Sequence, residues 1–114
     1  MYALVQDVML RSRIDALARA AGLDARFFPS ADALVDALVE PPELLVVDLS
    51  DRAGAGMALL ERLEGRGAPN VLAFYAHTDD ATRRRALELG AARVVPRSLL
   101  VKKFADLVRE TTAA

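Results

Sequence analysis

The most restrictive feature of this sequence is a repeated alternation between short apolar runs and longer stretches with helical periodicity. In each longer stretch the apolar residues recur every three or four positions, which is typical of an amphipathic helix. Five such units with short connections predict an α/β fold in which helices cover both faces of a parallel sheet. The expected strands are 2–5, 25–28, 44–49, 71–75 and 93–95.

Small polar residues mark the expected starts of the helices. Ser30 is predicted to cap the second helix and Ser98 the last, because their hydroxyls accept hydrogen bonds from the first free N–H groups. The fourth helix is expected to be capped by Thr78 or Asp79. The segment 50–56 is expected to be a polar, glycine-rich loop that precedes the third helix.

The length and composition suit a single domain over residues 1–114. Apolar residues make up 54% of the chain, which is enough to bury a substantial core. Charged residues make up 27%, and the formal net charge of −1 provides no overall attraction for nucleic acid or an anionic membrane. The absence of cysteine excludes disulfides and Cys-ligated metals.

Neither a signal peptide nor a transmembrane helix is expected. The first apolar run is only a few residues long, and charge follows it instead of preceding it. No stretch approaches the roughly 18 apolar residues of a membrane-spanning helix. We therefore expect a cytoplasmic protein. Because the chain ends shortly after the last expected helix, its output is expected to come from a partner protein, self-association or a domain outside this chain.

The residues that close the strands are the candidates for function, because ligands of open parallel sheets bind at the carboxyl ends of the strands. Asp48 is the most informative, since it ends the apolar run 44–49, where an uncompensated carboxylate would be costly. It could cap the amides of its own loop, or hold a metal ion or a phosphoryl group. The other residues expected at this edge are Gln6, Asp7, Tyr75, Ala76, His77, Pro96 and Arg97.

The whole chain resembles the bacterial response-regulator receiver domain. The family's phosphoacceptor strand, loop and third helix are similar to LLVVDLSDRAGAGMALLERL, in which Gly56 follows Asp48 by eight residues. Its fourth helix and fifth strand are similar to AHTDDATRRRALELGAARVVPRS. The resemblance implies a doubly wound, flavodoxin-like sheet with the strand order 2-1-3-4-5 and five helices.

In that family an aspartate accepts a phosphoryl group from a histidine kinase, and an acidic pair holds Mg²⁺ beside it. A Thr or Ser after the fourth strand and a Lys after the fifth bind the phosphoryl oxygens. The resemblance implies that Asp48 is the phosphoacceptor, and that Asp7, Asp48 and the backbone carbonyl of Ser50 are the candidate Mg²⁺ ligands. The remaining pocket positions are Gln6, Tyr75, Ala76 and Arg97.

The chain departs from the family pattern at several of these positions. Gln6 replaces one carboxylate of the acidic pair, and the lost negative charge weakens the expected Mg²⁺ site. Tyr75 replaces the small hydroxyl residue, so its hydroxyl lies too far out for the same contact. Arg97 replaces the lysine and can hold a phosphate bidentately, but it could also pair permanently with Asp48. Val94 replaces an aromatic residue that reports movement of the fourth-strand loop.

Two further residues have both a functional and a purely structural interpretation. Asp7 could bind a metal ion, or it could simply be a carboxylate at the start of the first helix. His77, the only histidine, is expected to be solvated at a loop rim, because no nucleophile partner is visible.

Basic residues near the end of the chain form a candidate interaction face. A run of charges such as this is typical of a solvated helix surface. In the receiver family, however, the fourth helix, fifth strand and fifth helix form the output and dimer face, so these residues could contact a partner or a second copy. They are Arg83, Arg84, Arg85, Lys102 and Lys103.

Three hypotheses about function remain. The favoured one is a degenerate receiver that acts by protein–protein interaction with a partner signalling protein or histidine kinase. The second is a Mg²⁺-dependent receiver that is switched by phosphorylation of Asp48. The third, a small flavodoxin-like enzyme or ligand binder, lacks support from a Ser-His-Asp set, a metal cluster or a cofactor fingerprint, so no catalytic residue is assigned.

Overall fold

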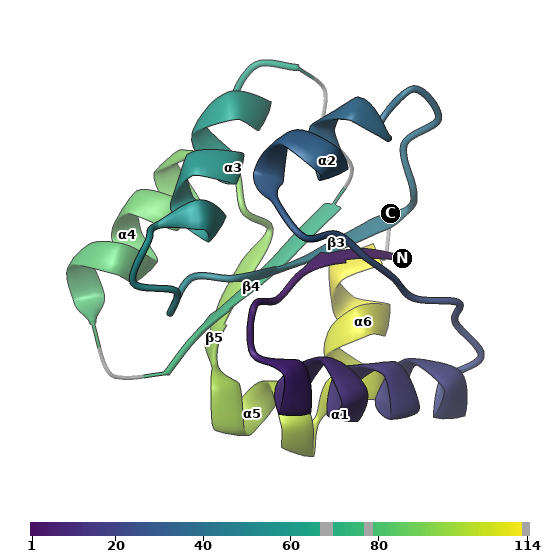
Figure 1. The fold of residues 1–114 in the computed structure, drawn as a ribbon. Helices are drawn as coiled ribbons and strands as arrows, with labels where there is room; N and C mark the ends of the chain where they lie inside the picture. Colours follow the sequence, from purple (N-terminus) through teal and green to yellow (C-terminus); the bar gives the residue numbers. More distant parts are fainter. Residues whose placement is uncertain (67–69, 77–78, 113–114) are drawn as a thin grey trace.

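The computed structural model describes residues 1–66, 70–76 and 79–112. Its centre is a five-stranded parallel sheet with the order β2-β1-β3-β4-β5, which confirms the predicted topology (Figure 1). The order reverses between β1 and β3, and ligands of open parallel sheets bind at such a switch point. The strands are β1 (Tyr2–Leu4), β2 (Arg26–Phe27), β3 (Leu44–Asp48), β4 (Asn70–Tyr75) and β5 (Arg93–Pro96).

Two layers of helices cover the sheet, as expected for a doubly wound α/β fold (Figure 1). One face carries α1 (Val8–Ala20), α5 (Arg97–Lys102) and α6 (Phe104–Thr112). The other face carries α2 (Ala31–Asp36), α3 (Ala55–Leu63) and α4 (Asp80–Glu88). The described residues contain no helix that is long and apolar enough to cross a membrane.

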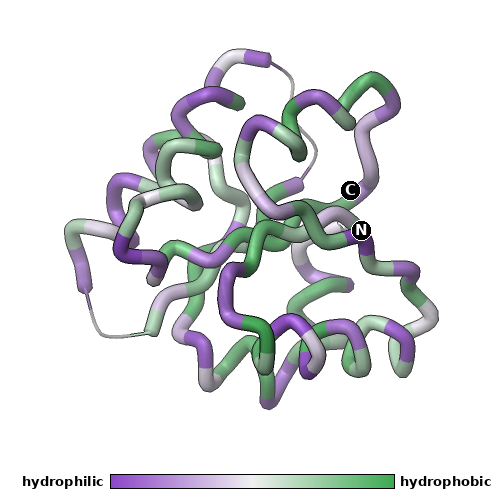
Figure 2. Tube along the Cα trace, viewed as in Figure 1, coloured by the Kyte–Doolittle hydropathy of each residue, from purple (hydrophilic) through white to green (hydrophobic). Residues whose placement is uncertain are grey.

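The central strand β3 is buried along its whole length. Its side chains alternate between the two apolar clusters: Val46 points to the α1 side, and Leu45 and Val47 point to the α3 side. This explains why its sequence reads as a continuous apolar run. Figure 2 shows the same concentration of hydrophobic residues in the strands at the centre of the molecule. Each fully buried aliphatic side chain there contributes about 1.5–3 kcal/mol.

Two of the predicted helix caps are confirmed. The Ser30 hydroxyl accepts a hydrogen bond from the Ala33 N–H at 3.1 Å, and the Asp79 carboxylate accepts one from the Thr82 N–H at 3.1 Å. Thr78, the alternative cap of α4, lies outside the described residues.

The predicted start of the last helix was wrong. Ser98 does not cap it, because α5 begins one residue earlier at Arg97, with Pro96 at the N-cap. The backbone of Pro96 is already extended there, with ψ at 148°, and its side chain offers no hydrogen-bond acceptor. Ser98 is therefore the second residue of the helix.

The single last helix that the sequence predicted is divided in two. Lys103 leaves the helical region with φ −123° and ψ 30°, and it separates α5 from α6. The described residues thus form six helices, not five. The inward and outward sides agree with prediction: Leu100, Phe104 and Leu107 are buried, whereas Lys102 and Lys103 are exposed.

Two other boundaries differ from prediction. The second strand has only two paired residues, although Phe28 beyond it still donates its N–H to the Ala3 carbonyl at 3.0 Å. Helix α3 begins at Ala55, so the loop after β3 is shorter than the predicted 50–56 and Gly56 is helical. The turn into α3 occurs at Gly54, whose φ of 74° is a conformation that glycine adopts without strain.

Candidate functional site

Parallel pairing brings the ends of β3, β4 and β5 together at one edge of the sheet. Asp48 is paired with Phe74, and Tyr75, the next residue on β4, is paired with Pro96. The Leu49 N–H continues the pairing with a 2.8 Å hydrogen bond to the Phe74 carbonyl. The segments that follow β1, β3, β4 and β5 therefore meet where the resemblance predicted a phosphoryl pocket.

Asp48 is buried, with 5% of its surface exposed, and its carboxylate is hydrogen-bonded within its own loop. The Oδ1 atom accepts a 2.8 Å hydrogen bond from the Ser50 N–H and a second one from the Ser50 hydroxyl. These two bonds satisfy the buried carboxylate, which would otherwise be costly. Loop capping, one of the roles that the sequence left open for Asp48, is therefore observed.

The contribution of the Ser50 hydroxyl was missed from the sequence, where only its backbone carbonyl was considered. A signal was present, because an aspartate side chain often bonds the backbone two residues further on. The pairing of Asp48 with the Ser50 N–H follows that pattern, and the hydroxyl then reinforces it.

Asp7 is the N-cap of α1. Its Oδ1 atom accepts a 3.0 Å hydrogen bond from the Leu10 N–H, which is the structural role that the sequence allowed for it. Its Oδ2 atom lies 3.9 Å from the Arg97 guanidinium. Both side chains are nearly half exposed, so this ion pair contributes at most about 1 kcal/mol.

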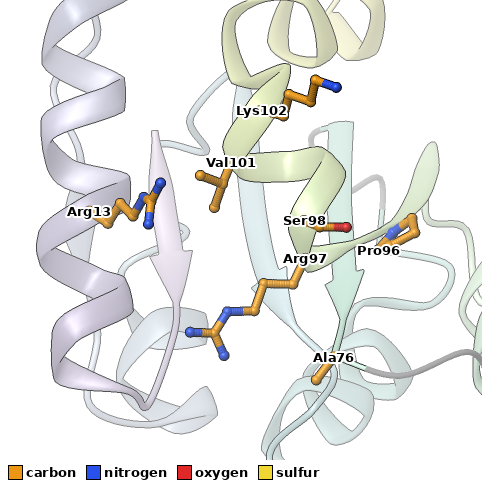
Figure 3. A pocket seen from close by; sticks show the side chains of 7 residues that line it. All are labelled: Arg13, Ala76, Pro96, Arg97, Ser98, Val101 and Lys102. Atoms are coloured by element: carbon orange, nitrogen blue, oxygen red, sulfur yellow. The ribbon is translucent and has the colours of Figure 1, made fainter.

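Arg97 therefore does not pair with Asp48 in the way that the sequence suggested. Among the residues that the structure describes, its carboxylate partner within 4.0 Å is Asp7. The side chain leaves the start of α5 and extends toward α1 (Figure 3). Ala76 is exposed, and it lines an open pocket together with Arg97.

The Gln6 side chain also contacts another loop instead of Asp48. It is exposed, and its Nε2 atom donates a 3.4 Å hydrogen bond to the Pro29 carbonyl. An amide can serve here as a donor to a loop carbonyl, which a carboxylate could not do. The replacement of acid by amide therefore has a structural use in joining the end of β1 to the loop after β2.

Tyr75 is half-buried and packs against the apolar cluster on the α3 side. It lines an open depression of ≈ 410 Å³ with Ser50, Arg52 and Thr82. Val94 is buried beneath the same face and has no aromatic ring that could report movement of the fourth-strand loop.

The donor set fits Mg²⁺ poorly. Mg²⁺ requires near-octahedral oxygen ligands, usually with one or two carboxylates free to bind it. Here one oxygen of Asp48 is held by Ser50, and Asp7 caps a helix while facing a guanidinium. The described part of the chain contains no group of three acidic or histidine side chains that could hold a metal ion.

Asp79 is the N-cap of α4, and it lines the same open depression as Tyr75. Its Oδ2 atom accepts a 2.6 Å hydrogen bond from the Thr82 hydroxyl. That bond, together with the one from the Thr82 N–H, lowers the pKa of Asp79 below its ordinary value, because both donors favour the ionised carboxylate. The neighbouring His77 lies outside the described residues.

The basic residues that formed the predicted interaction face lie in two separate places. Arg83, Arg84 and Arg85 are exposed on α4, and Arg85 approaches Glu88 at 3.7 Å. Lys102 and Lys103 belong to the opposite helix layer, where they line a groove against α1. The sheet therefore separates the arginine run from the two lysines.

The comparisons with known proteins agree on the fold. No model of a known protein family matches this sequence, and no curated protein matches it. The receiver domain of NtrX from Brucella abortus matches with a TM-score of 0.85 and 17% identity over 97% of this chain and 96% of that domain. This chain spans only 26% of the longer NtrX chain, with a TM-score of 0.84.

Two other solved structures extend this similarity. A response regulator receiver protein from Burkholderia phymatum has a TM-score of 0.80 and 26% identity, and the match covers 97% of this chain and 93% of that one. The DrrB receiver domain activated by BeF3 has a TM-score of 0.81 and 14% identity over 99% of this chain and 96% of that domain. The chain thus has the five-stranded, flavodoxin-like fold of response-regulator receiver domains.

Proposed function

We propose that this chain is a signal-transduction module of the receiver class that acts through protein–protein contact, with phosphorylation of Asp48 weakened or absent. The observation that carries the proposal is that the polar groups of the pocket already bind one another. Ser50 holds Asp48, while Arg97 faces Asp7. A phosphoryl group or Mg²⁺ would have to displace these contacts, and each displacement reduces the affinity.

The fold supports the class of function. The structural neighbours include isolated receiver domains and a longer NtrX chain of which this fold is about a quarter. Receiver domains transmit signals by contact with other proteins, so a histidine kinase or another signalling protein is the proposed partner. We assign no catalytic residue.

A phosphorylation switch is the second candidate, and one observation favours it. Asp48 lies at the carboxyl end of β3, with Gly56 packed against its backbone, which is the arrangement expected of a phosphoacceptor. In this alternative Mg²⁺ would bind weakly through Asp48 and the Ser50 carbonyl, and through Asp7 only after Arg97 moves. The related DrrB receiver domain is described as BeF3-activated.

The proposed contact surface is the exposed arginine run of α4. Arg83, Arg84 and Arg85 are all exposed, so the run presents positive charge that suits an acidic surface on a partner. A homodimer through α4, β5 and α5 is the other arrangement that the resemblance allows. Lys102 and Lys103 are less suitable for this surface because they line the groove on the α1 side.

The test is a titration of the protein with Mg²⁺ and beryllofluoride, followed by the amide shifts of residues around Asp48. Beryllofluoride mimics a phosphoryl group on an aspartate and needs the metal site. We expect no saturable shift near Asp48 or Ser50 at Mg²⁺ concentrations up to about 10 mM, because too few carboxylate oxygens are available.

The control is the Asp48→Asn variant, which keeps the Ser50 contacts but cannot bind beryllofluoride in the same way. Saturable shifts that disappear in this variant would refute the phosphorylation-independent proposal and support the switch.

Sedimentation of the wild-type protein and of the Arg84→Glu variant then distinguishes a partner surface from a homodimer. A dimer that is lost in Arg84→Glu would identify self-association as the output.

A further inference from the structure

An open pocket lies between α1 and α5, beside the phosphoacceptor edge. Its volume is ≈ 650 Å³, and Asp48 is not among its lining residues. Three cationic side chains and no acidic side chain line it. The full lining consists of Arg13, Ala76, Pro96, Arg97, Ser98, Val101 and Lys102.

Two arginines from different elements point into this pocket. Arg13 reaches from α1 and Arg97 reaches from the start of α5, and Figure 3 shows both guanidinium groups in the gap between the two helices. Lys102 points away from the gap in the same view. Within the described residues, Arg13 forms no ion pair within 4.0 Å, and the nearest carboxylate to Arg97 is Asp7 at 3.9 Å.

Positive charge is concentrated in this gap. The protein carries a net charge of −1, so the positive charge in the gap is not a consequence of a basic composition. Two like charges that face one gap repel each other, and an anion between them would remove that repulsion. Guanidinium groups match the oxygens of a phosphate bidentately, which makes a phosphate the best-suited anion.

The remaining lining is partly apolar. Val101 points into the gap from α5 (Figure 3), and Pro96 and Ala76 also contribute to the lining. The Ser98 hydroxyl adds one neutral hydrogen-bonding group. A few polar groups beside an apolar surface are typical of a small-molecule site, in which the charges fix one end and the apolar part binds the other.

We infer that this pocket binds a small organic phosphate, with its phosphate between Arg13 and Arg97 and its apolar or planar part against Val101. This goes beyond the proposed signalling function, because neither Asp48 nor Mg²⁺ takes part. It provides the domain with an input that does not depend on phosphoryl transfer. Binding would also draw Arg97 away from Asp7 and so connect the pocket to the start of α1.

The probe that tests this is phenylphosphonate at about pH 8, where the group is largely dianionic. Its carbon–phosphorus bond cannot transfer a phosphoryl group to Asp48, so binding is separated from phosphorylation. We expect saturable amide shifts at Val101, Ser98 and Ala76. Inorganic phosphate resembles only the anionic part of the probe and phenol only its aromatic part, so each should bind more weakly than phenylphosphonate.

The variant is Arg13→Gln, which alters this pocket and leaves the Asp48 loop intact. We expect it to weaken phenylphosphonate binding roughly tenfold, because one of two charged donors is lost. Arg66→Gln, in the turn after α3, is the matched control, since it removes the same charge from an exposed position outside the pocket lining and should leave the affinity unchanged.

Three results would overturn the inference. The first is a set of shifts that increase linearly with probe concentration and do not saturate. The second is an equal loss in Arg13→Gln and Arg66→Gln, which would mean a general effect of charge. The third is binding of inorganic phosphate as tightly as phenylphosphonate, which would exclude a role for the apolar wall. The beryllofluoride titration has an independent outcome, so either proposal can fail alone.

Discussion

The Cα of Gly56 in α3 lies directly against the backbone carbonyl of Asp48 at the end of β3. A Cβ atom at this position would lie 2.9 Å from the Asp48 carbonyl carbon and closer still to its oxygen, with the Val47 side chain at 3.2 Å. This contact explains the eight-residue spacing that the sequence showed. The first turn of α3 packs on the strand end so closely that only glycine fits, and this packing holds the loop after Asp48 in place.

Gly56→Ala is therefore expected to destabilise the protein by roughly 3 kcal/mol, because the backbone of β3 or α3 must shift. Urea unfolding measures the change. Gly65→Ala is the matched control: its φ of +74° is strained for alanine, but no atom lies within 4 Å of the new Cβ. We expect this control to cost only about 1–2 kcal/mol. Equal losses in the two variants would contradict the close-packing explanation.

Asp7→Ala is expected to lower the free energy of unfolding by about 1 kcal/mol, because α1 loses the side chain that caps it. Asp7→Asn keeps an oxygen acceptor for the Leu10 N–H but removes the charge that faces Arg97. It should cost less than about 0.5 kcal/mol if capping is the main role of the residue. Thermal denaturation of both variants checks this, and equal losses in Asp7→Asn and Asp7→Ala would show that the charge matters more than the cap.

Asp79 is expected to make stability depend on pH in the acid range. The folded state lowers the pKa of Asp79 through the bonds from Thr82, so folding favours the ionised form. The resulting stabilisation is present above the unfolded pKa and is lost as the pH falls through the lower folded-state pKa. Asp79→Ala should therefore have a lower melting temperature than the wild type at neutral pH.

The same comparison at an acid pH below the lowered folded-state pKa of Asp79 provides the control, because the carboxylate is then protonated in both states. The difference in melting temperature between the wild type and Asp79→Ala should shrink there. Asp79→Asn keeps an acceptor for the cap and should not show this pH dependence. A difference that stays constant from neutral pH to a pH below the folded-state pKa would exclude the assigned pKa effect.

The double variant Gln6→Asp with Arg97→Lys is expected to create a saturable Mg²⁺ site. The first change supplies a second carboxylate beside Asp7, and the second replaces the guanidinium with a more compact cation on a flexible stem. Calorimetric titration with Mg²⁺ measures the result. Arg97→Lys alone is the control, because it keeps the amide of Gln6. Tight Mg²⁺ binding by the wild-type protein would contradict the reasoning behind this variant.

The architecture could be predicted from the sequence to a large extent. The buried run at 44–49, the amphipathic stretches and the caps at Ser30 and Asp79 each depend on residues within a few positions of one another. The resemblance to receiver domains added the strand order, which the structure confirms. The start of α5 at Arg97 was missed, because Pro96 sets the backbone direction before Ser98 could act as a cap.

The sequence by itself determined the parallel α/β sheet and the location of Asp48 at its carboxyl edge. Only the tertiary structure decided which groups the pocket residues contact. Ser50 turns onto Asp48, Arg97 turns toward Asp7, and Arg13 comes to face the same gap as Arg97. The physical reason is that a hydropathy pattern records local burial. The partner of a long polar side chain depends instead on how distant elements pack and on which rotamer that packing leaves open.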